Sequence, residues 1–159
     1  MATYRTNRNI EKSILDYLQA QVASDWSNIR VEKTWANVKN GELPAVCVRI
    51  RDTSHERTGI GNTSTRRSCQ VLIDIFATSD GQKLDLEDYI VEKLKAGCTY
   101  YTYVTARSGN TTVVDSKTEN GRVRVFDIEV SPLDFDTDSV YDRYRSLITL
   151  EVRTSKVED

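Results

Sequence analysis

Three aspartates at alternate positions form the most suggestive chemical pattern in this sequence. Asp134, Asp136 and Asp138 have the one-three-five spacing with which a calcium-binding loop presents its carboxylates. The match fails further along, because Ser139 stands where the sharp turn needs glycine and Arg145 stands where a bidentate glutamate is needed. The segment is therefore interpreted as an acidic, solvated connection that interacts through its charge, and no metal is expected.

The cysteines and the single histidine are the next candidates for chemistry. The three cysteines are widely spaced without a Cys-x-x-Cys pair, and His55 is the only histidine that could join them at a metal. Zinc sites and disulfide frameworks have closer or paired spacings, so neither is expected here. Because Cys47 and Cys69 lie among strand residues, both are interpreted as buried thiols that pack like small hydrophobic side chains.

Other catalytic and nucleotide-binding patterns are incomplete. A Ser-His-Asp triad would have to use His55, and the nucleophile motif Gly-x-Ser-x-Gly does not occur. Gly59 and Gly61 are followed by strand residues rather than by a third glycine and a helix, so they do not form a phosphate-binding turn. The 24 acidic residues show no spacing that singles out an acid and a base. We expect a protein that is not an enzyme and that holds no cofactor.

Three arginines lie in a long polar stretch, SHERTGIGNTSTRRSC, at residues 54–69. The stretch joins two expected strands and is too long for an economical hairpin turn, so residues 53–67 are predicted to form a long mobile loop. Arg57, Arg66 and Arg67 are its candidate interaction residues, because arginine is enriched at protein interfaces. We expect them to become ordered when subunits assemble, facing a partner or a central channel. A tolerated insertion without a role is the alternative.

Hydrophobic periodicity assigns the elements that position these residues. Ile10, Ile14 and Leu18 repeat at helical spacing, whereas Val71 and Ile73 alternate with other residues as in a strand. The expected elements are a helix over 9–22, strands over 29–35, 46–50 and 69–76, a helix between 85 and 97, and strands over 99–107, 111–117, 122–131 and 140–155. Because hairpins link most strands, the expected fold class is α+β, with a mostly antiparallel or mixed sheet flanked by two helices in the order α-β-β-β-α-β-β-β-β.

Length and charge limit the class of protein. A chain of 159 residues favours one domain, residues 1–159, with a single core. Lys and Arg number 22 against 24 Asp and Glu, so the net charge of -2 gives no general attraction to nucleic acid or acidic membranes. The first residues lack the apolar region of a signal peptide, and no window approaches the roughly 20 apolar residues that cross a bilayer. We expect a product of the cytoplasm with no membrane partner.

Three segments together resemble a known family. They are LPAVCVRIRDTS at 43–54, CQVLIDIFATSDGQKLDLEDYIVEKLKAG at 69–97 and YRSLITLEVR at 144–153, and they follow an N-terminal amphipathic helix. In this order, with a long variable loop between the first two, they resemble the tail terminator, or tail completion, proteins of long-tailed bacteriophages. The resemblance covers most of the chain and lies mainly in the order of the elements.

The resemblance implies a structural role in the virion. Its members are small α+β subunits that form a hexameric ring, cap the completed tail tube, stop its polymerisation and dock on the head connector. The sheet faces inward and the helices outward, and residues 53–67 match by position a long hairpin loop near the lumen or the tube end. The expected partners are further copies of the chain, the tail tube protein and the head connector or neck protein. DNA would pass through the ring without sequence-specific binding.

Two alternatives to a tail terminator remain open. Within the same class, the chain would be another head–tail connector or neck protein of the virion. From a different class, it would be a soluble binding module that grips an anionic ligand or nucleic acid through Arg57, Arg66 and Arg67. The location expected for the terminator is the host cytoplasm during assembly and then the head-proximal end of the viral tail.

Overall fold

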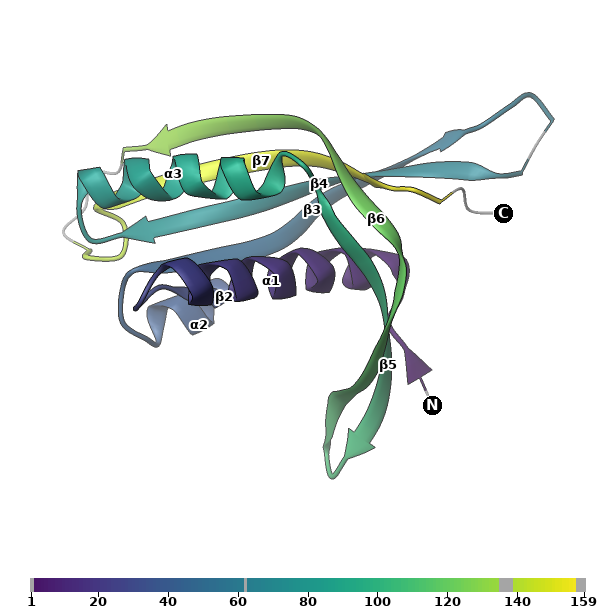
Figure 1. Cartoon of the computed structure of the whole chain (residues 1–159), viewed down its shortest axis with the longest axis horizontal. Helices are drawn as coiled ribbons and strands as arrows, with labels where there is room; N and C mark the ends of the chain where they lie inside the picture. The colour runs from purple at the N-terminus through teal and green to yellow at the C-terminus, as the bar shows by residue number, and fades with distance from the viewer. Residues whose placement is uncertain (1, 62, 135–138, 157–159) are drawn as a thin grey trace.

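The computed structural model describes residues 2–61, 63–134 and 139–156, and within them the chain forms one curled seven-stranded sheet with three helices (Figure 1). The strands are β1 Ala2–Thr3, β2 Arg30–Glu32, β3 Ala45–Arg57, β4 Thr65–Ala77, β5 Cys98–Ser108, β6 Thr111–Leu133 and β7 Tyr144–Thr154. The helices are α1 Thr6–Asp25, α2 Trp35–Lys39 and α3 Asp80–Leu94. Across the sheet the order is β1-β5-β6-β7-β4-β3-β2; β2 and β3 are parallel, and the other neighbours are antiparallel.

The two long helices cover one face of the sheet. α1 buries Ile10, Ile14 and Leu18 against the strands, and α3 buries Leu86 and Ile90. The strand residues of this main core alternate along the central strands: Val46, Val48, Val71, Ile73, Ile75, Ile148, Leu150 and Val152. Because alternate side chains of a strand point to opposite faces, these residues define one side of the sheet, here called the covered face. Its reverse is called the open face.

The short helix α2 lies over one corner of the open face. Thr34 caps the helix by accepting a hydrogen bond from the amide of Asn37, 3.2 Å away. Beneath the helix is a second, smaller core of buried side chains: Val38, Ala45, Cys47 and Phe76. Since this small core lies on the opposite face of β3 and β4 from the main core, α2 and the two long helices sandwich the sheet at this corner.

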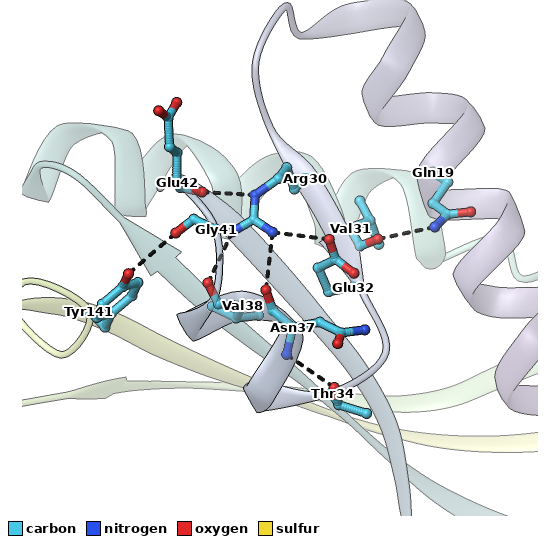
Figure 2. Close-up of polar contacts among 10 residues, drawn as sticks. All are labelled: Gln19, Arg30, Val31, Glu32, Thr34, Asn37, Val38, Gly41, Glu42 and Tyr141. Atoms are coloured by element: carbon cyan, nitrogen blue, oxygen red, sulfur yellow. Dashed lines mark hydrogen bonds and ion pairs between the residues drawn. The ribbon is translucent and has the colours of Figure 1, made fainter.

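Arg30 holds the far end of α2 and the turn that follows it (Figure 2). Its guanidinium donates to the carbonyl oxygens of Val38 at 3.0 Å and Asn37 at 3.2 Å, and its Nε donates to that of Glu42 at 2.8 Å. A positive charge at the last carbonyls of a helix is favourable and satisfies acceptors that a short helix leaves free. Gly41 makes room for the guanidinium, because a Cβ there would lie 2.4 Å from Arg30 Cζ.

Helix α1 also protects two edges of the curled sheet. On one side, Asn9 accepts a hydrogen bond from the amide of Tyr103 in β5, at 3.3 Å. On the other side, Glu11 accepts one from the amide of Ile50 in β3, at 3.0 Å. An unpaired edge is a template for unwanted strand pairing. Side chains of α1 therefore take the place of a neighbouring strand at both edges.

Two hairpins project from the body in different directions (Figure 1). In the first, here called the β3–β4 arm, Thr53–Arg57 pairs in antiparallel register with Thr65–Cys69. Only residues 58–64 remain between the two strands. The prediction of a loop over 53–67 is therefore wrong in extent, since both of its ends belong to strands. The apolar alternation that marks a strand is missing because the arm extends beyond the core and leaves most of its side chains exposed.

The second hairpin, here called the β5–β6 arm, pairs Tyr101–Ser108 with Thr111–Glu119, and it changes the predicted order of elements. β6 runs without interruption over Thr111–Leu133, where two strands over 111–117 and 122–131 were predicted. Gly121 adopts φ +108°, which lets the strand pass through the sequence that suggested a turn. Of the strand predicted over 29–35, only Arg30–Glu32 is a strand, and Trp35 is the first residue of α2. The fold class itself is confirmed as α+β, with a mostly antiparallel sheet and two long flanking helices.

Candidate interaction surface

Outside the corner covered by α2, most side chains of the open face are polar or charged, and Leu147 and Phe126 are exceptions. Along β7, Thr149, Glu151 and Arg153 point to this face and are partly exposed, whereas the intervening Leu150 is fully buried on the covered face. Three zones follow one another along the strands: a buried ion-pair cluster beside α2, an acidic cleft and a basic cleft.

The ion-pair cluster centres on Asp74 of β4, which is 1% exposed. One carboxylate oxygen accepts a hydrogen bond from Arg145 Nη2 at 2.9 Å. The other accepts from Trp35 Nε1 at 3.1 Å and from Arg49 Nε at 3.3 Å. The Arg145 guanidinium also lies 4.3 Å from the ring centroid of Phe76 and is itself buried. Asp74 and Arg145 are buried and partnered within the chain, whereas Arg49 is partly exposed. The cluster attaches α2 to the sheet through Trp35 and is not interpreted as a binding site.

The acidic cleft lies next to this cluster, across β3, β4, β7 and β6. Its volume is about 360 Å³, and its acidic lining consists of Asp52, Asp127, Glu129 and Glu151. Ser68 donates a hydrogen bond to Glu151 at 3.0 Å. Among the residues that the structure describes, no three His, Cys, Asp or Glu side chains form a group able to hold a metal ion. The cleft thus presents a negative patch on the open face.

The basic cleft lies further along the same strands, towards the base of the β3–β4 arm. It has a volume of about 210 Å³ and is lined by Arg66, Arg124, Phe126, Arg153, Thr154, Ser155 and Lys156. The Arg153 guanidinium lies 4.7 Å from the ring centroid of Phe126 and donates to Glu151 at 3.2 Å. Four cations around an aromatic ring suit an anionic partner, and Glu151 links this cleft to its acidic neighbour.

The three arginines predicted to act together are separated by the structure. Arg66 and Arg67 are consecutive in β4, so their side chains leave opposite faces of the arm. Arg67 donates a hydrogen bond to Asn7 at the start of α1, whereas Arg66 faces the basic cleft. Arg57, near the tip of the arm, is exposed and lies with Arg66 beside Glu56. Only Arg57 and Arg66 therefore remain candidates for contact with a partner.

The predicted acidic connection is described only in part. Asp134 directly follows β6 and is exposed. Asp136 and Asp138 lie outside the described residues. Beyond them, Asp142 accepts a hydrogen bond from Arg145 at 3.1 Å, and Tyr141 donates its hydroxyl to the carbonyl of Gly41 at 3.3 Å. The described end of this connection is thus attached to the ion-pair cluster and to the turn after α2.

The thiols are buried, as the sequence predicted for Cys47 and Cys69. Burial raises the pKa of Cys47 to about 12, with Asp74 contributing in the same direction, and burial also raises the pKa of Cys98 to about 12. A thiol with such a pKa carries almost no thiolate near neutral pH, and the thiolate is the nucleophile. His55 is exposed in the β3–β4 arm, opposite Arg67 in register, and it lies eight residues further along β3 than Cys47.

Sequence reasoning missed the basic cleft because its members come from three strands. Arg124 and Arg153 are partners in the register of β6 and β7, and the sequence places them 29 residues apart. A register shift between Val125 and Asp127 accompanies the placement of Phe126 beside Arg153. The usable signal was the alternation of arginine with valine in RVRV at 122–125, which predicts one charged strand face.

Comparison with known proteins assigns no family. No family model matches the sequence, and no curated protein matches it at a significant level. Within the described residues, no helix is both long and apolar enough to cross a membrane. The resemblance to tail terminators therefore stays a hypothesis that rests on the three sequence segments. Further support for a function has to come from the geometry of the surface.

Proposed function

We propose that this protein is a structural subunit of a long-tailed phage, the tail terminator, which assembles as a hexameric ring on the completed tail tube. In this role it stops polymerisation of the tube and forms the surface on which the head connector docks. It acts through protein interfaces and carries out no reaction. A different connector or neck protein of the same head–tail junction is the nearest variant of this proposal.

The observation that carries the proposal is the pair of arms. Both arms project from the body (Figure 1). Most residues of the β3–β4 arm are exposed, and so is the β6 half of the β5–β6 arm, Thr111–Glu119, whereas its β5 half buries Tyr103 and Thr105. Ordering a residue costs about 1–2 kcal/mol of backbone entropy, which an isolated hairpin hardly recovers in water. Arms of this kind gain their stability and their use when they contact another subunit. Two projecting arms would allow one subunit to contact its neighbours in a ring.

The zones of the open face fit the same role. The resemblance implies a ring in which the sheet faces the lumen, and the open face is the one that α1 and α3 leave free. In that orientation the basic cleft would meet DNA phosphates, while the acidic cleft would repel them. Contacts of both signs permit DNA to pass without being held at one position.

A second candidate function rests on the basic cleft alone. Arg66, Arg124, Arg153 and Lys156 could hold the phosphates of a nucleic acid while Phe126 contacts a base, in a binding module that acts as a monomer. The set of binding residues would differ from the one predicted from the sequence, because Arg67 is hydrogen-bonded to Asn7 of α1. A monomer of this kind would have no need for the β5–β6 arm.

Light scattering on the purified protein over a concentration series tests the proposal. A mass near six times 18.1 kDa is expected for the wild type. Shortening the β3–β4 arm by replacing residues 56–66 with Asn-Gly should leave the melting temperature within a few degrees while impairing tail joining, since the removed pairs lie outside the core. A monomer at every concentration that binds an oligonucleotide with a steep salt dependence would overturn the proposal in favour of the second candidate.

A further inference from the structure

Strand β6 is paired on both sides, but along different halves. β5 pairs with it over Thr111–Val123, and β7 pairs with it on the other side over Val123–Leu133. Within the described residues, Thr111–Glu119 has no strand on the β7 side, and Arg124–Leu133 has none on the β5 side. We call the first stretch the arm edge and the second the body edge. The two free edges thus lie on opposite sides of a single strand.

Both edges expose apolar side chains. On the arm edge, Val113 and Val114 are 44% and 37% exposed; on the body edge, Phe126 and Val130 are 57% and 37% exposed. Long edges with exposed valine and phenylalanine are sites of strand addition. Elsewhere this protein shields its strand edges, since α1 side chains accept hydrogen bonds from edge amides of β3 and β5. The described structure leaves the two edges of β6 without such protection.

We propose that the arm edge of one copy pairs with the body edge of the next, so that the sheet continues from subunit to subunit. The inference rests on the proposed function, which supplies the second copy. Both stretches are of similar length, nine and ten residues, and each has backbone donors and acceptors, apart from Pro132 on the body edge, which has no N–H. Because the edges lie on opposite sides of the strand, the contact is heterologous: each subunit uses one edge for each neighbour. Repeated contacts of this type close into a ring or continue as an open chain.

Blocking each edge separately gives a sharp test. Lysine on an exposed edge opposes strand addition, so V113K/V114K blocks the arm edge and V130K blocks the body edge. Val140 is an exposed valine outside β6, and V140K is the matched control. Each blocked variant by itself should be a monomer, because its remaining edge has no partner. An equimolar mixture of the two should form dimers of twice 18.1 kDa and nothing larger, since only one contact can form.

The outcomes separate this inference from the proposed function. Circular dichroism and melting first establish that all variants are folded, and V140K should keep the wild-type mass. A wild-type ring together with blocked variants that also form rings would overturn the edge pairing and leave the ring proposal intact. A mixture that stays monomeric would also overturn the edge pairing. Wild-type chains of indefinite length, with dimers in the mixture, would support the edge pairing and refute the closed ring.

Discussion

The covered and open faces of the sheet are held by different forces, although the same strands form both. In β7, Ile148 and Leu150 are fully buried among aliphatic side chains of α1 and α3. Their neighbours Leu147, Thr149 and Glu151 are partly exposed on the open face. One face therefore contributes most of the apolar burial, while the other remains available for contacts with partners.

The corner under α2 is the exception on the open face, and it shows how polar groups can be buried there. Asp74 is as inaccessible as the aliphatic core, yet it is a charged group surrounded by Arg145, Arg49 and the indole of Trp35. Hydrogen bonds to oppositely charged partners offset the cost of burying this charge. Loss of any one partner should therefore destabilise the corner. We therefore expect a large loss in the free energy of unfolding when one polar partner at this corner is removed. Polar substitutions elsewhere on the open face should cause small losses.

Removing Asp74 should have the largest effect on stability. D74A leaves the buried Arg145 guanidinium without its main carboxylate, and we expect a loss of about 4 kcal/mol in the free energy of unfolding. Urea denaturation measures the change. The matched control is D142A, because Asp142 pairs with the same guanidinium but is more exposed; its loss should be about 1 kcal/mol or less. Equal losses in the two variants would refute the special role of the buried carboxylate.

Truncating neighbouring residues of β7 compares the two faces directly. I148A creates a cavity in the main core and should cost about 3 kcal/mol. T149A changes the adjacent residue on the open face, where the side chain is partly exposed, and should cost about 0.5 kcal/mol. The same urea experiment gives both values. If the costs were similar, the open face would have to be packed against something in the isolated subunit.

The elements of the covered face were predictable because each buries a regular stripe. Ile10, Ile14 and Leu18 mark α1, and Val71 and Ile73 mark β4, by periods that only regular burial produces. Helix α2 was missed because it contributes a single buried residue, Val38, over five positions. The paired ends of the β3–β4 arm were missed because exposed strands have no apolar period. Sequence patterns reveal elements through the core, and elements outside the core lack that signal.

The candidate surface was harder to predict than the fold. Arg57 and Arg66 were predicted from the sequence and stay candidates, whereas Arg67 was grouped with them although alternation along a strand separates it from Arg66. The cations that accompany Arg66 come from β6 and β7, so the cleft exists only through the register of three strands. The free edges of β6 follow from the partial overlap of its two neighbours, which no local pattern encodes.

The reactivity of the buried thiols tests whether α2 protects its corner from solvent as well as the long helices protect the covered face. Burial raises the pKa of Cys47, in the small core under α2, and of Cys98, in the main core, to about 12 each. These thiols stabilise the fold below the unfolded value near pH 9, and that contribution is lost as the pH rises toward 12. At pH 8 neither thiol should react with a thiol reagent in the native protein.

V38A truncates the one buried side chain of α2 and should lower the free energy of unfolding by about 2 kcal/mol.

Local opening of α2 in V38A should then expose one thiol and leave the other protected. We expect labelling of Cys47 to accelerate about tenfold or more at pH 8, because each 1.4 kcal/mol of lost local stability raises the open population tenfold. Labelling of Cys98 should stay at the wild-type rate, since Cys98 belongs to the main core and Val38 to the separate small core. Mass spectrometry of the labelled peptides distinguishes the two sites. Parallel acceleration at both cysteines would mean that the corner and the covered face open together, which would contradict their separate stabilisation.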